Sequence, residues 1–169
     1  MRKIHTKKKK IDLSTVIVMG ILNITDNSFY DGNIYNSEEK ILTQTKKMLE
    51  EGATIIDLGT QSSKPNSKPI SEKEETKKLV SIIQLLQQNF PEIIISVDTY
   101  RSKVAEKCIN TGANIINDIS AGEMDKEMFA TIAKLKVPYI IMHMKGIPKT
   151  MQNNPQYNNV VEEVFLYLE

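Results

Sequence analysis

The sequence predicts an α/β protein built on a parallel sheet, and three observations support this. Five short apolar runs, at 16–23, 53–57, 92–98, 113–118 and 137–143, each end in a polar or charged residue. Stretches with the apolar periodicity of a helix separate them. A run that is apolar on every side is typical of a strand covered on both faces. The polar ends of these strands then meet at one edge of the sheet, where ligands bind in βα folds.

Length and charge limit the possible classes of protein. The chain has 169 residues, with 22 basic and 21 acidic side chains and a formal net charge of +1. We expect residues 1–169 to form a single domain, because this length can bury one sizeable core. The balanced charge argues against a nucleic-acid partner. We interpret the basic run 7–10 as part of a solvated leading segment, residues 1–14, that ends in a short edge strand at 11–13.

Cysteine content and hydropathy favour the cytoplasm. The single cysteine, Cys108, excludes a disulfide within the chain, and it falls on the apolar side of an expected helix. No apolar stretch is long enough to cross a bilayer, so we expect no membrane partner. The N-terminus has positive charge but no apolar region followed by a cleavage site, so we expect no signal peptide.

Capping residues place the first two helices. The first is expected to begin after an N-cap at Asn36 and to end at Gly52, which suits the left-handed region. The second begins at Ser71, which forms a capping box with Glu74, and Pro91 stops it. Both helices carry an apolar stripe for packing against the sheet.

Three more helices follow with the same logic. The third ends at Gly112, and the fifth begins near Asn158. The apolar positions expected on the third are Val104, Ala105, Cys108 and Ile109, and those on the fourth are Met128, Phe129, Ile132, Ala133 and Leu135. The order of elements is therefore a strand followed by a helix, five times over.

An internal repeat favours a barrel. The segment GATIID at 52–57 matches GANIIN at 112–117, 60 residues later, which is about the length of two βα units. The order suits a doubly wound sheet or the first part of a (β/α)8 TIM barrel. No G-x-G-x-x-G fingerprint follows the first strand, and the regular polar strand ends favour the barrel. Since five units cannot close eight, we predict an incomplete barrel of about five βα units.

Two loops after strand ends are rich in hydroxyl and amide groups. They span 23–33 and 59–67. Loops of this composition often cover a bound substrate. In the second loop, Ser62, Ser63 and Lys64 offer two hydroxyls and a positive charge, which suit a phosphate group. The same residues suit an ordinary turn, and composition leaves both interpretations open.

Single polar residues at the strand ends also carry two interpretations each. Asp98 can accept two N–H bonds from a flat aminopyrimidine-like edge, or it can cap the helix that follows. Asn117, beside Asp118, has the same ambiguity. Asn23 can bind Mg²⁺ through its side-chain oxygen, although one oxygen is a weak site. His143 lacks a second histidine near it in sequence, so we favour a structural role.

Five segments, taken in order, resemble the signatures of dihydropteroate synthase. They are MGILNIT with NSFYDG (19–32), DLG with QSSKP (57–65), ISVDT (95–99), INDIS (116–120) and MHMKG with PKTMQ (142–152). The resemblance runs from about residue 11 to the last residue. The order, spacing and number of the matches make it more specific than any one motif.

The resemblance implies a transferase of folate biosynthesis on a (β/α)8 barrel. Such an enzyme condenses 6-hydroxymethyl-7,8-dihydropterin diphosphate with 4-aminobenzoate to give 7,8-dihydropteroate and diphosphate. It further implies a Mg²⁺ cofactor, a homodimer for the full-length family, and a sulfonamide target.

The resemblance also assigns roles around the pterin. It implies that Asp98 and Asn117 hold the pterin, that Met142 lines its slot, and that Asn23 contacts the diphosphate and its Mg²⁺. Asp98, Asn117 and Lys64 would form the catalytic set.

The remaining implied roles lie in the two polar loops. Ser63 and Lys64 would meet the diphosphate or the aminobenzoate. Phe29 and Pro65 would wall the aminobenzoate pocket. Asp31 would help to order the first loop over the leaving group.

The chain departs from the family pattern in three ways. The first loop usually reads T-P-D-S-F, whereas residues 25–29 read T-D-N-S-F. Lys64 stands where the family carries arginine, which removes a bidentate fork for oxyanions. The family also continues through a second aspartate, a Ser-Arg-Lys lysine and a final Arg-x-His, which this sequence lacks. We therefore expect the 169 residues alone to be inactive or very weakly active.

Two alternatives remain. One is another pterin-binding barrel enzyme, such as a methyltetrahydrofolate methyltransferase, which would share the strand-end Asp and Asn but lack the SSKP and PKTMQ segments. The other is a non-catalytic pterin-binding paralogue, for which the altered loops would be a symptom.

Overall fold

A computed structural model describes residues 3–6, 9–24, 34–60, 70–147, 150–151 and 153–169. Five of its strands form one parallel sheet in chain order: β3 (Val18–Asn23), β4 (Ala53–Gly59), β5 (Ile94–Asp98), β6 (Ile115–Asp118) and β7 (Tyr139–Ile141). A helix separates each strand from the next. The predicted parallel sheet with alternating helices is confirmed.

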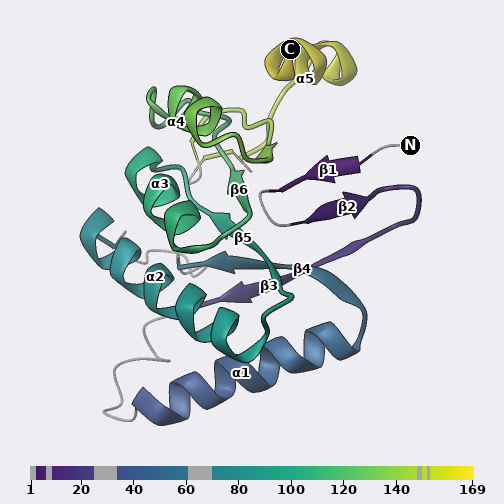
Figure 1. The fold of residues 1–169 in the computed structure, drawn as a ribbon. Coiled ribbons are helices and arrows are strands. Elements are labelled where there is room, and N and C mark those ends of the chain that lie inside the picture. The colour runs from purple at the N-terminus through teal and green to yellow at the C-terminus, as the bar shows by residue number, and fades with distance from the viewer. Residues whose placement is uncertain (1–2, 7–8, 25–33, 61–69, 148–149, 152) are drawn as a thin grey trace.

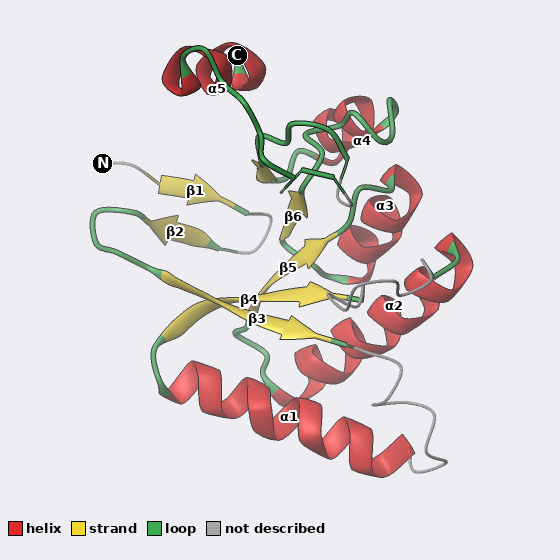
Figure 2. Ribbon diagram, turned by 180° about the vertical axis from the view of Figure 1, so that it is seen from behind, coloured by secondary structure: helices red, strands yellow, loops and turns green. Residues whose placement is uncertain are grey.

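Four helices cover one face of this sheet, as Figures 1 and 2 show from opposite sides. They are α1 (Ile34–Glu50), α2 (Glu72–Asn89), α3 (Ser102–Thr111) and α4 (Met128–Leu135). The main core lies between these helices and the sheet, where Ile56, Ile95 and Ile116 of three neighbouring strands are each 0% exposed. We call this the outer face. Because strand side chains alternate, every second residue points to the opposite, inner face.

Two of the predicted helix signals act as expected. The Ser71 hydroxyl accepts from the backbone N–H of Glu74 at 3.2 Å at the start of α2. Gly112 ends α3 with φ 128°, and its N–H donates to the carbonyl of Cys108 at 3.0 Å. In α3 the Cys108 side chain is fully buried, and burial raises the pKa of its thiol to about 12.

Two other helix predictions are wrong in detail. The first helix begins at Ile34, so Asn36 lies inside its first turn and is not the cap. In α4, the buried stripe consists of Met128, Ile132 and Leu135. Phe129 is 56% exposed, because it lies one position off that stripe, and its ring meets Tyr139 edge-on at 5.7 Å. Ala133 is exposed for the same reason.

The N-terminal residues form a separate hairpin. β1 (Lys3–His5) pairs antiparallel with β2 (Lys10–Asp12), so the expected short strand at 11–13 begins one residue earlier and does not join the parallel sheet. Ile11 is 3% exposed and packs with Ile55, Ile94 and Ile115. The hairpin therefore closes the amino-terminal end of the inner face (Figure 1).

The last helix stands apart from the sheet. α5 (Val160–Leu168) begins at an Asn159 cap and has no buried residue. Lys145 connects it to the chain after β7 through an ion pair with Glu163 at 2.7 Å. Within the described part of the chain, no helix is both long and apolar enough to cross a membrane.

Candidate active site

One row of inner-face residues crosses all five parallel strands near their carboxyl ends. Asn23 is in register with Gly59, Gly59 with Asp98, Asp98 with Asn117, and Asn117 with Ile140. Residues in register on a parallel sheet share one face, so the side chains of Asn23, Asp98 and Asn117 gather at one end of it. We call this the carboxyl row. Three predicted site residues thus lie together.

A second row lies one layer closer to the amino ends. Ile21, Asp57, Ser96 and Ile115 are in register with one another there. Asp57 is 4% exposed and Ser96 is 0% exposed, so this row places two polar groups in the interior. One oxygen of Asp57 and the hydroxyl of Ser96 have no hydrogen-bond partner among the described residues.

Asp98 is not a helix cap. Helix α3 begins only after Arg101, and the backbone N–H of Ser102 donates instead to Asp125 at 2.7 Å. Asp98 is the last residue of β5 and belongs to the carboxyl row. The geometry therefore removes the capping interpretation and leaves the carboxylate facing the inner side of the sheet.

The environment of Asp98 favours its protonated form. Burial raises the pKa of Asp98 to about 6, from an ordinary value of 3.8. The negative charges of Asp57, Glu75 and Asp118 are the smaller causes of the same shift, in that order. Of these three, Glu75 forms an ion pair with Arg101 that offsets its charge. A cationic or N–H-rich ligand at Asp98 would reverse this cost by favouring the carboxylate.

Asn117 and Asp118 have different tasks. The Asn117 Nδ2 group donates to Oδ2 of Asp57 at 3.2 Å. Asp118 is 0% exposed and accepts from Ser120 N and Oγ, both at 2.8 Å, and from the Tyr139 hydroxyl at 2.6 Å. Asp118 thus organises the loop after β6, while Asn117 belongs to the inner-face cluster.

Gly59 leaves space between two oxygen atoms of the carboxyl row. A Cβ atom on Gly59 would stand 2.8 Å from Oδ1 of Asn23 and 3.6 Å from Oδ2 of Asp98. Oxygen ligands of this kind suit Mg²⁺, which usually takes one or two protein oxygens and completes its shell with water and phosphate. Among the described residues there is no cluster of three or more His, Cys, Asp or Glu that could hold a metal ion by itself. Asn23 Oδ1 could therefore hold a Mg²⁺ ion only together with oxygens from a phosphate-bearing ligand and water.

Two residues singled out in the sequence, Met142 and His143, lie just beyond β7. Met142 is 36% exposed and directly follows the strand. His143 packs against two tyrosine rings, Tyr157 with ring centroids 5.8 Å apart and Tyr167 at 4.8 Å. These contacts agree with a structural role for His143.

Five predicted site residues lie outside the described part of the chain. They are Phe29, Asp31, Ser63, Lys64 and Pro65. Their roles remain predictions from the sequence.

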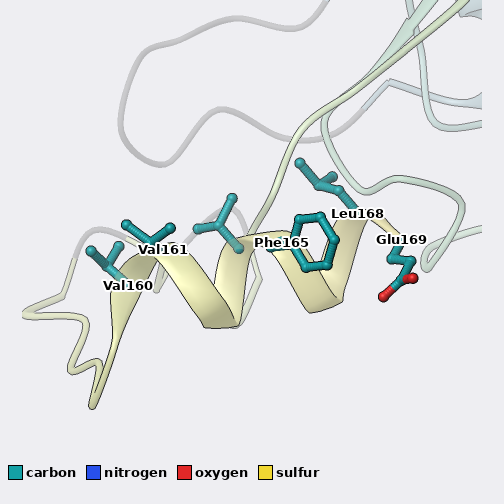
Figure 3. Close-up of a pocket in the computed structure, with 6 residues that line it drawn as sticks. Val160, Val161, Phe165, Leu168 and Glu169 are labelled. Atoms are coloured by element: carbon teal, nitrogen blue, oxygen red, sulfur yellow. The ribbon is translucent and has the colours of Figure 1, made fainter.

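A concave apolar surface is present elsewhere, on α5 (Figure 3). Val160, Val161, Phe165 and Leu168 line it, and Glu169 supplies its only carboxylate side chain. It contains none of the carboxyl-row residues and offers little polar recognition. The carboxyl row is the better candidate, because it brings polar side chains together and includes a carboxylate of raised pKa, Asp98.

Comparison with known proteins identifies the family. The family model described as "Pterin binding enzyme" matches residues 19–169. The chain belongs to the pterin-binding enzyme family.

Within this family the chain is similar to dihydropteroate synthases. It is 43% identical to the dihydropteroate synthase of Haemophilus influenzae over 167 residues, covering 99% of this chain and 60% of that protein. The pterin-binding chain therefore spans less than two thirds of the length of this relative.

Solved structures agree with the family and with the fold. A Yersinia pestis dihydropteroate synthase in a sulfonamide drug complex superposes with a TM-score of 0.85 at 35% identity, covering 98% of this chain and 60% of that one. A Xanthomonas albilineans dihydropteroate synthase with 4-aminobenzoic acid gives 0.83 at 30% identity, covering 98% and 58%. The predicted fold class, an incomplete barrel of five βα units, is confirmed.

Sequence reasoning did not single out Asp57 as a site residue. The signal was present, because the repeat aligns Asp57 with Asn117, 60 residues apart. Each copy of the repeat has a polar side chain at the same sequence position of its βα unit. In the structure these two side chains, Asp57 and Asn117, are joined by a hydrogen bond.

Proposed function

We propose that this pterin-binding chain holds the pterin ring of 6-hydroxymethyl-7,8-dihydropterin diphosphate at the carboxyl row. We further propose that the complete enzyme condenses this substrate with 4-aminobenzoate to give 7,8-dihydropteroate and diphosphate. The observation that carries the proposal is the pairing of Asp98 with Asn117 in register at the carboxyl ends of β5 and β6. A carboxylate and an amide side by side suit the N–H-rich edge of a pterin.

The chemistry follows from charge. Departure of diphosphate leaves positive charge on the methylene carbon, which the pterin ring shares. The Asp98 carboxylate, held against the ring, stabilises that charge without reorganisation. The arylamine nitrogen then forms the new C–N bond and releases a proton, and the reactive carbon makes a strong general base unnecessary.

The leaving group needs its own partners. We propose that Asn23 holds Mg²⁺ through Oδ1, and that Ser63 and Lys64 donate to the diphosphate or to the aminobenzoate. When bound, Mg²⁺ supplies positive charge to the diphosphate. Phe29 and Pro65 would wall the aminobenzoate pocket, with Asp31 ordering the loop between 25 and 33.

Pterin binding tests the first part of the proposal directly. The chain contains no tryptophan, so pterin fluorescence can be followed without overlap from that residue. We expect Asp98→Asn to weaken binding of 6-hydroxymethylpterin roughly a hundredfold, since two charge-assisted hydrogen bonds are lost. Asp12→Asn, which removes an exposed carboxylate from β2, should leave the affinity unchanged. Equal affinities for all three proteins would contradict the proposal.

Turnover tests the second part. Diphosphate release is measured with both substrates and Mg²⁺ for the 169-residue chain. We expect little or no release, because the later aspartate, lysine and arginine motifs of the family are absent from this sequence. Near-normal turnover would contradict that expectation, and pterin binding without turnover in a complete protein would favour the non-catalytic alternative.

We also infer the setting of the complete enzyme from its resemblance to the family. It would work in the cytoplasm as a homodimer, with small molecules as its only ligands. Residues 1–169 would form one domain. A single unfolding transition for this chain, and a dimer mass for a complete relative by light scattering, are the expected results.

A further inference from the structure

The buried carboxylate of Asp57 has no evident structural purpose. It is 4% exposed at the middle of β4, where an apolar side chain would pack without cost. One of its oxygens accepts from Asn117, and the other has no partner among the described residues. Burying an oxygen without a hydrogen bond destabilises a fold, so such a group calls for an explanation in function.

Its neighbour in the same row reinforces this point. Ser96 is in register with Asp57 on β5, is 0% exposed, and also lacks a partner for its hydroxyl among the described residues. The two unpartnered oxygens lie directly beneath the carboxyl row that holds Asp98. Two such costs at one place indicate a surface prepared for something other than folding.

The hydrogen bond to Asn117 has a direction that matters. An ionised carboxylate can only accept, so Asp57 requires the Nδ2 group of Asn117 to face it. The carbonyl oxygen Oδ1 of the Asn117 amide must then face the opposite way. An asparagine at position 57 could either donate or accept, and it would impose no such orientation.

We propose that Asp57 is a positioning residue that orients the Asn117 amide, so that Asn117 Oδ1 is presented as an acceptor to an N–H group of the pterin. This inference rests on the proposed function, since it assumes that the carboxyl row holds a pterin. The hydrogen bond crosses β5, from Asp57 on β4 to Asn117 on β6. Asp57 lies one row nearer the amino ends of the strands than Asp98 and Asn117, so it supports the carboxyl row from beneath.

The charge of Asp57 has a second effect on the same surface. After burial, the charge of Asp57 is the largest cause of the raised pKa of Asp98. This charge makes ionisation of Asp98 harder in the empty site, and a donor-rich ligand would offset that effect by favouring the carboxylate. Asp57 thus acts on both residues of the pterin-binding pair from one position.

Three variants of the 169-residue chain separate positioning from a role in folding. Asp57→Asn keeps the size of the side chain and its ability to form a hydrogen bond, but it can donate as well as accept and so no longer fixes the orientation of the Asn117 amide. Asp57→Val removes the acceptor with a residue that suits a strand. Ser96→Ala is the matched control, because it removes a polar group from the same row without touching Asn117.

We expect Asp57→Asn to weaken 6-hydroxymethylpterin binding about threefold to tenfold, and Asp57→Val about tenfold or more. In Asp57→Val the side-chain NH₂ signal of Asn117 in a ¹H–¹⁵N spectrum should move, while the melting temperature stays equal or rises. In Ser96→Ala that signal should stay in place.

Two outcomes would overturn the inference. One is an Asn117 NH₂ signal that does not move in Asp57→Val. The other is a lower melting temperature of Asp57→Val with unchanged pterin affinity, which would make Asp57 structural. Failure of the unaltered chain to bind pterin would instead contradict the proposed function, and the Asn117 signal would still test the orientation by Asp57.

Discussion

The two ends of the inner face are built from the same strands and differ in what closes them. At the amino end, Ile55, Ile94 and Ile115 are buried beneath Ile11 of the hairpin. At the carboxyl end, the row of Asn23, Asp98 and Asn117 carries no such cover among the described residues.

This difference shows that position along a strand decides the task of a residue. Alternation selects the face, since Ile94, Ser96 and Asp98 all point inward from β5. Four residues along that strand, the buried apolar side chain of Ile94 gives way to the Asp98 carboxyl group, whose pKa is about 6. The amino end contributes stability, and the carboxyl end gives up stability to keep polar groups ready for a ligand.

Shortening a buried side chain at the amino end of the inner face should have the largest effect on stability. Ile115 is 1% exposed in the apolar cluster beneath the hairpin. We expect Ile115→Ala to lower the free energy of unfolding by about 2–5 kcal/mol, because it removes buried methyl groups and leaves a cavity. Urea unfolding measures this directly. Ile21→Ala is the control on the same face, where the side chain is 60% exposed, and an equal loss there would remove the contrast.

At the carboxyl end of the inner face, we expect a substitution to raise the free energy of unfolding. The folded-state pKa of Asp98 is raised from 3.8 to about 6, so the folded protein holds this proton more tightly than the unfolded chain. Stability from this group is present below pH 4 and is lost as the pH rises to about 6, with a total of about 3 kcal/mol. Asp98→Asn has no carboxyl group to ionise, so it does not lose this stability as the pH rises.

The measurement is the free energy of unfolding of Asp98→Asn and of the unaltered chain at pH 4 and pH 8. Asp98→Asn should be the more stable protein at pH 8, with a much smaller difference at pH 4. A variant that is less stable at pH 8 would mean that the carboxylate stabilises the fold, contrary to the comparison.

The smallest effect is expected at Gly59. A methyl group there would stand 2.8 Å from Oδ1 of Asn23, so the short Asn23 side chain must move. We expect Gly59→Ala to change stability by less than about 1 kcal/mol, and to weaken the Mg²⁺-dependent part of pterin diphosphate binding a few-fold. Titration with and without Mg²⁺ measures this. An unchanged Mg²⁺ dependence would argue against Asn23 as a ligand.

Much of this architecture could be predicted from the sequence. Four strands of the sheet lie within a predicted apolar run, and β4 extends two residues past its run, because continuous burial on both faces leaves a strong local signal. Asn23, Asp98 and Asn117 were found for the same reason, since each ends such a run. The start of α1 was missed by three residues, because Asn and Ser also occur in a first turn.

Other features depend on contacts that the local pattern does not contain. The strand Lys3–His5 is short and charged at both ends, and only the packing of Ile4 and Ile11 on distant strands makes the hairpin recognisable. The link between Asp57 and Asn117 depends on the stagger of β4 relative to β6. The sequence repeat shows that both residues occupy the same position of their βα units. It does not show that they lie within hydrogen-bonding distance of each other, as they do in the structure.

Mapping the pterin site by NMR tests the central claim most directly. The 169-residue chain, labelled with ¹³C and ¹⁵N, is titrated with 6-hydroxymethylpterin. We expect shifts concentrated at Asn23, Asp57, Asp98 and Asn117, with the hairpin and the apolar surface of α5 unaffected. Shifts concentrated on α5 or on the hairpin, or no shifts at saturating pterin, would contradict it.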